Sequence, residues 1–554
     1  MDRREIIKRL SAVPFAGAML PIESMVDTQS RRGANAAPTQ NIYQEIGVEP
    51  VINCRGTVSI VGGSLERPAV REAMHRASGY FVQYDELAFG IGQRLADLTG
   101  AEWGMVSAGC AAAMKHVTAA CITGGNPERL IRIPNLAGFE KTEVVCPTAS
   151  RNVYDASMRT LGVTMINADT LEDMEKALSS KTAMIYYNNT QMPNDGADGP
   201  FSLERVARIA KPLNIPVLSD AAAEDLTVPN VHLQRGADVV AYSGGKALCG
   251  PTCAGLILGK KDILMAAWQA SSPHHGPGRD NKVGKEEMMG MLAAVEDWLK
   301  RDHVEKERTW RTWLENISKR LSAINGVTCT ITEPRALSNH SHRLSVSWNP
   351  EVFNINGMDV SEELANTKPR VSLSGAYLDN NGMTSVSIGS GQMQPGEDKV
   401  VADRLYEILT RKNEKPKGMA APLANITGHW DVDIEFFSSK GRHSFYIEQD
   451  GNYVGGSHKG VFTTRPMYGI VDGNKVLLTS TDRPPEMPST ISGNRLPFSV
   501  PFTFHGTATN NKMEGEIYMY EYLRVPFTAT RYVQPPNPAI NRPIVVPKGQ
   551  PLAS

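Results

Sequence analysis

The stretch DVVAYSGGKALCGPTCAGLILGKKDIL, residues 238–264, sets one lysine among small and apolar residues. Its first part, DVVAY, predicts a buried strand that ends in a turn at Gly244 and Gly245, and AGLILGK (254–260) predicts a second buried strand. A buried ammonium group is costly unless it is paired or used chemically. We therefore ask which groups elsewhere in the chain would pair with Lys246 or use it chemically.

Short apolar runs alternate with amphipathic segments on both sides of this stretch. TAMIYYNN (182–189) and IPVLSDAAAE (215–224) predict two more buried strands. Between them, LERVARIAKPLN (203–214) predicts a helix with one apolar face. Strand–helix–strand repetition of this kind predicts an α/β domain, in which helices cover both faces of a mostly parallel sheet.

The sequence pattern changes at two later points in the chain. The stretch 285–321 predicts a long helical region that leads into a small α+β lobe, and a charged, Pro- and Gly-rich linker follows. The domains that we predict are a signal segment (1–36), the large α/β domain (41–297), the small lobe (298–412), a linker (413–423), an antiparallel β-barrel (424–534) and an extended tail (535–554).

Evenly spaced hairpins in the C-terminal part predict an antiparallel barrel or sandwich. Alternating strands such as GHWDVDIEFF (428–437) are joined by turns such as Asp450-Gly451-Asn452 and Asp472-Gly473-Asn474. The opening Gly428-His429-Trp430 resembles the Gly-x-Trp start of lipocalin-like, or calycin, barrels. That resemblance implies a closed barrel whose ligand is a glycan, a lipid or a partner, or a barrel that only covers the rest of the protein.

The first residues resemble a twin-arginine export signal. Arg3 and Arg4 precede a short apolar run, residues 10–20, and Ala34-Asn35-Ala36 supplies a small-x-small cleavage site. The rival interpretation is an amphipathic N-terminal helix. We expect a periplasmic or exported protein, with no membrane association once the signal is removed, because no later stretch is typical of a membrane span.

Composition excludes several function classes. The 554 residues carry a formal net charge of -1, which argues against a nucleic-acid partner. Seven cysteines are too few and too scattered for a disulfide framework. Cys249 and Cys253 lie close together, but no second Cys or His pair stands nearby, so we interpret them as packing residues and predict no metal site.

Lys246 has the surroundings that a Schiff-base lysine needs. It lies with Ser243 at the carboxyl end of a predicted strand, where open α/β sheets bind ligands, and desolvation favours the neutral amine that attacks a carbonyl. Pyridoxal phosphate (PLP) would also need an acid beside its ring nitrogen, and Asp220 ends another predicted strand. The rival interpretations are a surface ion pair for Asp220 and an ordinary turn at Lys246.

A phosphate cradle is the remaining requirement for PLP. GMVSAGCAAAMKHVTAA (104–120) passes from a strand into an alanine-rich helix, and free N–H groups at such a helix start bind phosphate. An ordinary helix cap is the rival interpretation. The order of loop, acid and lysine in one α/β domain favours the cofactor; the predicted cradle is Ser107, Ala108, Gly109, Cys110 and Ala111, with Ser243.

Residues 42–412 resemble the PLP-dependent fold-type-I enzymes that include seryl-tRNA selenium transferase and the D-glucosaminate-6-phosphate ammonia-lyases. The resemblance rests on the run from 236 to 264 and on LADLTGAEWGMVSAGCAAAM (95–114), PVLSDAAAE (216–224) and GRDNKVGKEEMMGMLAAVE (278–296). It implies that Lys246 carries the cofactor, that Asp220 pairs with the ring nitrogen, and that the protein is a homodimer or a higher homo-oligomer.

The resemblance also implies substrate contacts. Arg279 and Lys282 lie where members of the family present cations, to an anionic substrate or to the cofactor phosphate of a dimer mate. His274 and His275 are candidate substrate contacts, with an exposed loop pair as the rival interpretation. Arg370 is a candidate clamp for a carboxylate, with a structural ion pair as its rival.

These parts predict a PLP-dependent lyase. We expect α,β-elimination with ammonia release from a small-molecule amine, either an amino sugar acid or a hydroxy amino acid. An aminotransferase or a racemase on the same scaffold is the first alternative, and an inactive PLP-fold binding protein is the second. The predicted export signal argues against a phosphorylated sugar acid and against selenium transfer to tRNA, because both substrates are cytoplasmic.

Overall fold

The computed structural model of the chain describes residues 41–192, 198–334, 336–376, 378–379, 381–414, 418–480, 502–519 and 523–533. The predicted signal (1–36) and tail (535–554) lie outside these residues. Contacts divide the chain into Met1–Val51 and Ile52–Ser554. The described part of the first unit forms a short 3-10 helix, η2 (Gln44–Ile46). Within the described ranges, no helix combines the length and the apolar character needed to cross a membrane.

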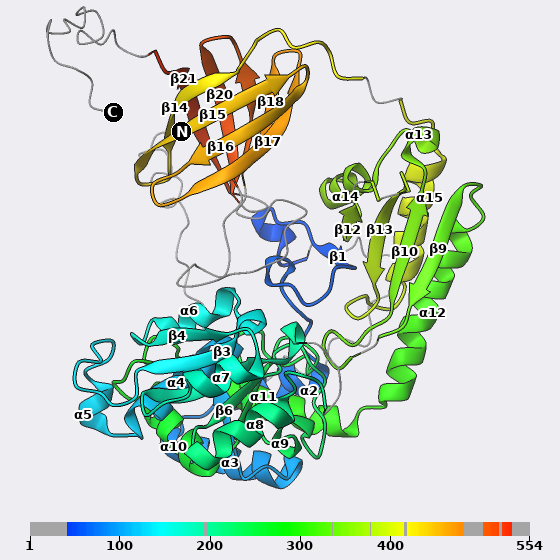
Figure 1. Cartoon of the computed structure of the whole chain (residues 1–554). Coiled ribbons are helices and arrows are strands. Elements are labelled where there is room, and N and C mark those ends of the chain that lie inside the picture. The colour runs from blue at the N-terminus through cyan, green and yellow to red at the C-terminus, as the bar shows by residue number, and fades with distance from the viewer. Residues whose placement is uncertain are drawn as a thin grey trace, which may run out of the picture. The chain divides into compact units, whose positions relative to one another are not determined.

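A seven-stranded sheet carries the large α/β part of the second unit (Figure 1). The strand β8 runs antiparallel to both of its neighbours, and the other adjacent strands are parallel. The predicted mostly parallel sheet is therefore confirmed. Its strands, in spatial order, are β2 (Trp103–Ser107), β8 (Gly255–Gly259), β7 (Val239–Ser243), β6 (Val217–Asp220), β5 (Thr182–Asn188), β3 (Glu143–Pro147) and β4 (Thr164–Ala168).

Alternate residues of the central strands serve two separate cores, because successive side chains of a strand point to opposite faces. One set packs with α4 (Cys110–Thr123) and includes Val144, Met184, Tyr186 and Leu218. The other set packs with α7 (Leu171–Ala177) and α8 (Leu203–Ala210) and includes Val145, Ile185, Tyr187 and Val217. Burial on both faces explains the continuous apolar runs from which these strands were predicted.

The predicted helical stretch 285–321 is two helices, α11 (Lys285–Lys300) and α12 (His303–Leu321). The break follows from Asp302, whose side chain accepts a hydrogen bond from the backbone N–H of Glu305 at 2.9 Å and caps α12. The predicted domain boundary at 297 falls within α11 and stays a prediction. The remaining helices of this part are α2 (Pro68–Ser78), α3 (Tyr84–Thr99), α5 (Pro127–Leu130), α6 (Ala156–Arg159), α9 (Val231–Gln234) and α10 (Lys261–Ala270).

A four-stranded antiparallel sheet follows, with the order β12 (Ser374–Ala376), β13 (Thr384–Gly389), β10 (Arg343–Trp348) and β9 (Val327–Thr332). Burial alternates along β10, because one face packs against helices. This core, which includes Leu314, Val346 and Trp348, shares no residue with the cores of the large sheet. The helices of this part are α12, α13 (Pro350–Phe353), α14 (Gly357–Asn366) and α15 (Glu397–Thr410).

The C-terminal strands form a closed antiparallel barrel, as predicted. Pairing of the first strand with the last closes it, and both predicted turns contain a glycine in the left-handed region, Gly451 and Gly473. Trp430 is fully buried and donates a hydrogen bond to the carbonyl of Ile426 at 2.8 Å. The strands are β14 (Gly428–Glu435), β15 (Lys440–Asp450), β16 (Tyr453–Lys459), β17 (Thr464–Asp472), β18 (Lys475–Ser480), β19 (Phe502–Ala508), β20 (Lys512–Met519) and β21 (Leu523–Arg531).

Candidate active site

Two neighbouring parallel strands bring Asp220 and Lys246 to one cavity. Asp220 is the last residue of β6, and Lys246 lies in the turn directly after β7. Because β6 and β7 are parallel, their carboxyl ends meet at the same edge of the sheet. Both residues line a cavity of about 1390 Å³. The two groups that the sequence singles out as acid and amine therefore share one site.

Asp220 is buried, and the donors around it fix its carboxylate. The hydroxyl of Tyr186 donates to Oδ2 at 2.7 Å, and the backbone N–H of Ala222 donates to Oδ1 at 3.0 Å. Asn152 in turn donates to the Tyr186 hydroxyl at 2.9 Å. Burial, and then the charge of Asp220, hold the pKa of Tyr186 well above its usual range. The phenol therefore stays protonated and orients the carboxylate.

The predicted phosphate cradle forms the turn between β2 and α4. Gly109 has φ +90°, a conformation that favours glycine, and α4 begins at Cys110. The Ser107 hydroxyl donates to the carbonyl of Gly109 at 2.9 Å, so this side chain holds the turn itself. A Cβ atom at Gly255 on the adjacent strand β8 would lie 2.6 Å from the Gly109 carbonyl carbon, so the turn also requires glycine there.

Cys110 links this turn to Asp220. Its thiol donates to Oδ1 of Asp220 at 3.5 Å, and burial raises the pKa of the thiol. Ala108, Gly109 and Ala111 are half-buried around it. None of residues 107–111 is among those that line the cavity, and neither is Ser243. The hydrogen bond between Cys110 and Asp220 therefore connects the start of α4 to the cavity.

Ser243 and the two glycines after it serve the packing of the turn. The backbone N–H of Ser243 donates to the carbonyl of Ala222 at 3.2 Å. A Cβ at Gly244 would lie 2.7 Å from the carbonyl oxygen of Ala254, and one at Gly245 would lie 2.6 Å from the Cα of Thr252. The chain's own packing therefore accounts for glycine at both positions.

The predicted substrate contacts on the loop after α10 do not line the cavity. His274 bonds to the carbonyl of Trp268 at 3.1 Å and lies 3.1 Å from a carboxylate oxygen of Asp85. His275, Arg279 and Lys282 are exposed. The roles of these four residues as substrate contacts therefore stay predictions.

Arg370 lies on β11 (Arg370–Ser372) and donates to the carbonyl of Ala365 at 2.5 Å. It too is absent from the cavity wall. Arg343, at the start of β10, lines the cavity and donates to Ser387 at 3.3 Å. Arg343 is therefore better placed than Arg370 to hold a carboxylate in this cavity.

The site contains groups that were not predicted. Asn152 and Asn188 line the same cavity as Asp220, and Tyr186 donates a hydrogen bond to Asp220. The amide of Asn189 donates to the Ser219 hydroxyl at 2.7 Å and to the carbonyl of Asp220 at 3.1 Å. The stretch TAMIYYNN could have indicated these residues, since its two asparagines end an otherwise apolar strand at the edge of the sheet where ligands bind.

Comparisons with known proteins agree with this geometry. No family model matches the chain. The D-glucosaminate-6-phosphate ammonia lyase of Salmonella typhimurium is 29% identical over 379 residues, which are 67% of this chain and 98% of that enzyme. A solved structure of a D-glucosaminate-6-phosphate ammonia-lyase superimposes with a TM-score of 0.60 at 28% identity, covering 68% of this chain and all of that one. The chain is a homologue of these enzymes.

Two further relatives show how widely this scaffold is used. A 5'-C-glycyluridine monooxygenase-decarboxylase of Streptomyces is 28% identical over 394 residues, 68% of this chain and 94% of that protein. An L-seryl-tRNA(Sec) selenium transferase of Moorella thermoacetica is 27% identical over 320 residues, 52% of this chain and 64% of that protein. The chain thus has the fold of the PLP-dependent fold-type-I enzymes, with an added barrel.

Proposed function

We propose that the chain is a PLP-dependent lyase that releases ammonia from a small-molecule amine. The observation that carries the proposal is the meeting of Lys246 and Asp220 at adjacent strand ends in one cavity. The similarity to an ammonia lyase over 98% of that enzyme's length supports the reaction class. The proposed chemistry uses no residue of the barrel.

The residues present fit the cofactor. Asp220 is a buried carboxylate at a strand end, fixed by three donors, and such a group needs a cationic partner like a protonated pyridine nitrogen. Lys246 would bind the aldehyde carbon covalently. The phosphate cradle at the start of α4 stays a proposal, because residues 107–111 do not line the cavity. When bound, the cofactor withdraws electrons from the substrate and so stabilises negative charge at its α-carbon.

Lys246 then moves the proton. With cofactor and substrate bound, the Nζ of Lys246 would accept the proton from the substrate's α-carbon. Loss of that proton and of a hydroxyl from the β-carbon, followed by hydrolysis, yields a keto acid and ammonia. The hydrogen bonds from Tyr186 and Ala222 prevent the Asp220 carboxylate from turning away.

The proposed substrate is an amino sugar acid or a hydroxy amino acid. A carboxylate would bind the guanidinium of Arg343, which lines the cavity and has a planar fork of donors. A β-hydroxyl would face the asparagine side chains of Asn152 and Asn188. The remaining earlier predictions stay proposals: a homodimer or a higher homo-oligomer, export through residues 1–36, and no nucleic-acid or membrane partner.

Borohydride trapping tests the proposal. Purified protein should absorb visible light with PLP and should yield a reduced adduct on Lys246 after borohydride treatment and peptide mapping. Lys246→Ala should remove the adduct and lower ammonia release by about 10³-fold or more, since one group supplies both the attachment and the base. Lys176→Ala is the matched control, because Lys176 pairs with Glu172 on the exposed face of α7.

The same preparation separates the alternatives. Ammonia release without a keto-acid acceptor supports the lyase, whereas strict dependence on an acceptor identifies an aminotransferase. Exchange of the α-proton with solvent without ammonia release identifies a racemase. A protein that gains no absorbance and no adduct is an inactive binding protein, and this result rejects the proposal.

A further inference from the structure

The turn after β7, residues 244–249, carries Lys246 and is called the lysine turn below. Among the residues that the structure describes, none forms a hydrogen bond or an ion pair with the Lys246 ammonium group. The backbone N–H of Lys246 donates to the carbonyl of Ser243 at 3.4 Å, and its carbonyl accepts from the backbone N–H of Cys249 at 3.0 Å. The shape of the lysine turn therefore decides the point from which Nζ extends.

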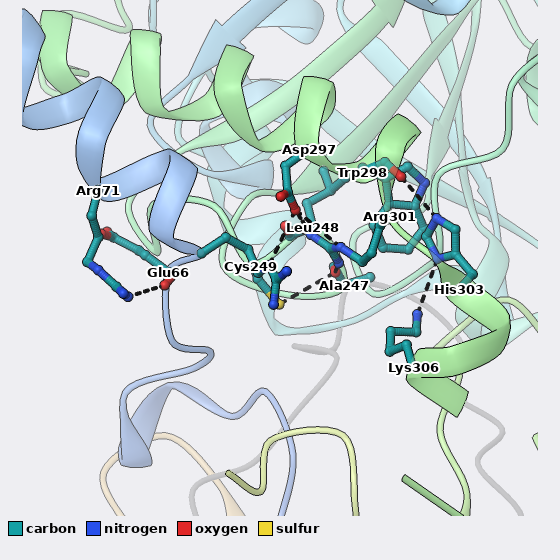
Figure 2. Close-up of polar contacts among 11 residues, drawn as sticks. Glu66, Arg71, Ala247, Leu248, Cys249, Asp297, Trp298, Arg301, His303 and Lys306 are labelled. Atoms are coloured by element: carbon teal, nitrogen blue, oxygen red, sulfur yellow. Dashed lines mark hydrogen bonds and ion pairs between the residues drawn. The ribbon is translucent and has the colours of Figure 1, made fainter. Parts of the chain in front are cut away.

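One side chain bonds two successive carbonyls of the lysine turn. The guanidinium of Arg301 donates to the carbonyl of Ala247 at 3.3 Å and to that of Leu248 at 3.2 Å (Figure 2). Within the described part of the chain, no backbone N–H donates to either carbonyl. A carbonyl that is withdrawn from water needs a donor. Arg301 thus supplies what the lysine turn, which is neither helix nor strand, does not supply for itself.

The fold holds the Arg301 side chain in one orientation. Only 8% of it is exposed, and its Nε and Nη2 donate to Oδ2 of Asp297 at 3.2 and 2.7 Å. Its Cζ lies 5.0 Å from the ring centroid of Trp298. Arg301 also directly follows the last residue of α11, where the helix dipole favours a cation. The guanidinium is therefore oriented before any ligand arrives.

Asp297 connects the same turn to a second helix. Its Oδ2 also accepts from Nε of Arg67 at 3.3 Å, and the backbone N–H of Arg67, the capping residue of α2, donates to the carbonyl of Cys249 at 3.1 Å. Burial alone would raise the pKa of the Asp297 carboxyl, but Arg301 and Arg67 hold this pKa below its usual value. The carboxylate therefore stays charged at neutral pH, and two helices fix the lysine turn.

Support of the backbone suits a lysine that must react. An ion pair to the amine would favour its charged form, whereas attack on an aldehyde needs the neutral amine. Hydrogen bonds to the carbonyls of the turn leave Nζ free and still define where it starts. Displacement of a reacting group by about 1 Å costs about 10²-fold in rate. The support of the lysine turn therefore bears directly on the chemistry of Lys246.

We propose that Arg301 is a positioning residue for Lys246, an inference that rests on the function proposed above. By bonding the carbonyls of Ala247 and Leu248, it fixes where Nζ meets the aldehyde carbon of PLP and the α-carbon of the substrate. Asp297 acts one step further away, because it orients the guanidinium. Arg301 also lines the cavity, so direct contact with the cofactor is the rival role that the experiment must separate.

A double-mutant cycle on PLP binding separates the two roles. Equilibrium dialysis should show that Arg301→Met binds PLP at least about tenfold more weakly than the parent protein, because a displaced lysine turn makes the covalent linkage less favourable. In a Lys246→Ala background PLP binds without the linkage, and the same change should alter its affinity by less than about twofold. Arg94→Met is the matched control: it removes an arginine from Glu296 on α11 and should leave PLP binding unchanged.

Two further variants of the same support sharpen the test. Arg301→Lys keeps the charge but has no planar fork with which to bond two carbonyls and a carboxylate together, so PLP binding should stay weakened. Asp297→Asn keeps the shape and removes the charge that orients the guanidinium, so it should weaken binding in the same direction and by a smaller factor. If circular dichroism shows that Arg301→Met does not fold, Asp297→Asn in both backgrounds takes its place.

Equal weakening in both backgrounds would overturn the inference, since it would mean that Arg301 contacts PLP or supports the whole site. Unchanged binding in the protein that keeps Lys246 would overturn it too. The proposed function is scored separately by ammonia release. Arg301-dependent linkage in a protein that releases no ammonia rejects only the lyase. Ammonia release with normal PLP binding in Arg301→Met rejects only the inference, and a parent protein without an adduct rejects both.

Discussion

Tyr186 shows how one buried side chain prepares the site. Its hydroxyl accepts from Asn152 and donates to Asp220, so three polar groups from separate segments form one chain of hydrogen bonds. Removing the Tyr186 hydroxyl leaves a donor of Asn152 and an acceptor of Asp220 without this partner, which costs more than the bonds themselves. The carboxylate that a cofactor would meet is therefore held before any ligand arrives.

Tyr186→Phe should lower the free energy of unfolding by about 1.5–3 kcal/mol, because the lost hydrogen bond is made to a charged group. Urea denaturation measures this. Tyr187→Phe is a matched control on the next position of β5, since its hydroxyl donates to the backbone carbonyl of Phe201. It should cost about 1 kcal/mol, as expected for a neutral bond. Equal losses in the two variants would show that the charge of Asp220 plays no part.

The helix α3 shows how packing overrides local preference at the scale of one element. Glycine weakens a helix interior, yet α3 contains Gly90 and Gly92. A Cβ at Gly92 would lie 2.5 Å from the indole ring of Trp103 on β2, whereas one at Gly90 would have nothing within 4 Å. Close approach of helix and sheet explains the second glycine and leaves the first without a structural role.

Alanine substitutions in α3 should therefore have opposite signs. Gly90→Ala should stabilise the protein by about 0.5–1 kcal/mol, through the better helix propensity of alanine. Gly92→Ala should destabilise it by about 1–3 kcal/mol, because helix or indole must shift. Thermal melting of both variants checks the signs. A stabilised Gly92→Ala variant would mean that the helix and the strand separate without cost.

At the scale of the whole molecule, the protein contains separate hydrophobic cores. The barrel core, which includes Phe445, Phe504 and Phe527, shares no residue with the core of the small lobe or with those of the large sheet. A closed barrel has no free edge strand through which it must pair with another element. The barrel therefore has what it needs to unfold as a cooperative unit of its own.

Calorimetry of the full chain should show a transition that belongs to the barrel. Phe504→Ala should destabilise that transition by about 3–5 kcal/mol, as the ring is fully buried among other aromatic rings. The other transitions should stay in place. Leu314→Ala, in the core of the small lobe, should produce the reverse pattern. A single transition that moves in both variants would show that the parts unfold together.

The sequence by itself determined the mostly parallel sheet, the antiparallel barrel, and the placement of Lys246 and Asp220 at one edge of the sheet. Apolar runs and turn residues are local signals, and parallel strands place their carboxyl ends together wherever they lie in the sheet. Tertiary structure alone decided which arginine enters the cavity, why Gly244 and Gly245 are glycines, and that Asn152 and Tyr186 join the site. Those facts depend on distances between segments far apart in the chain, which no local pattern records.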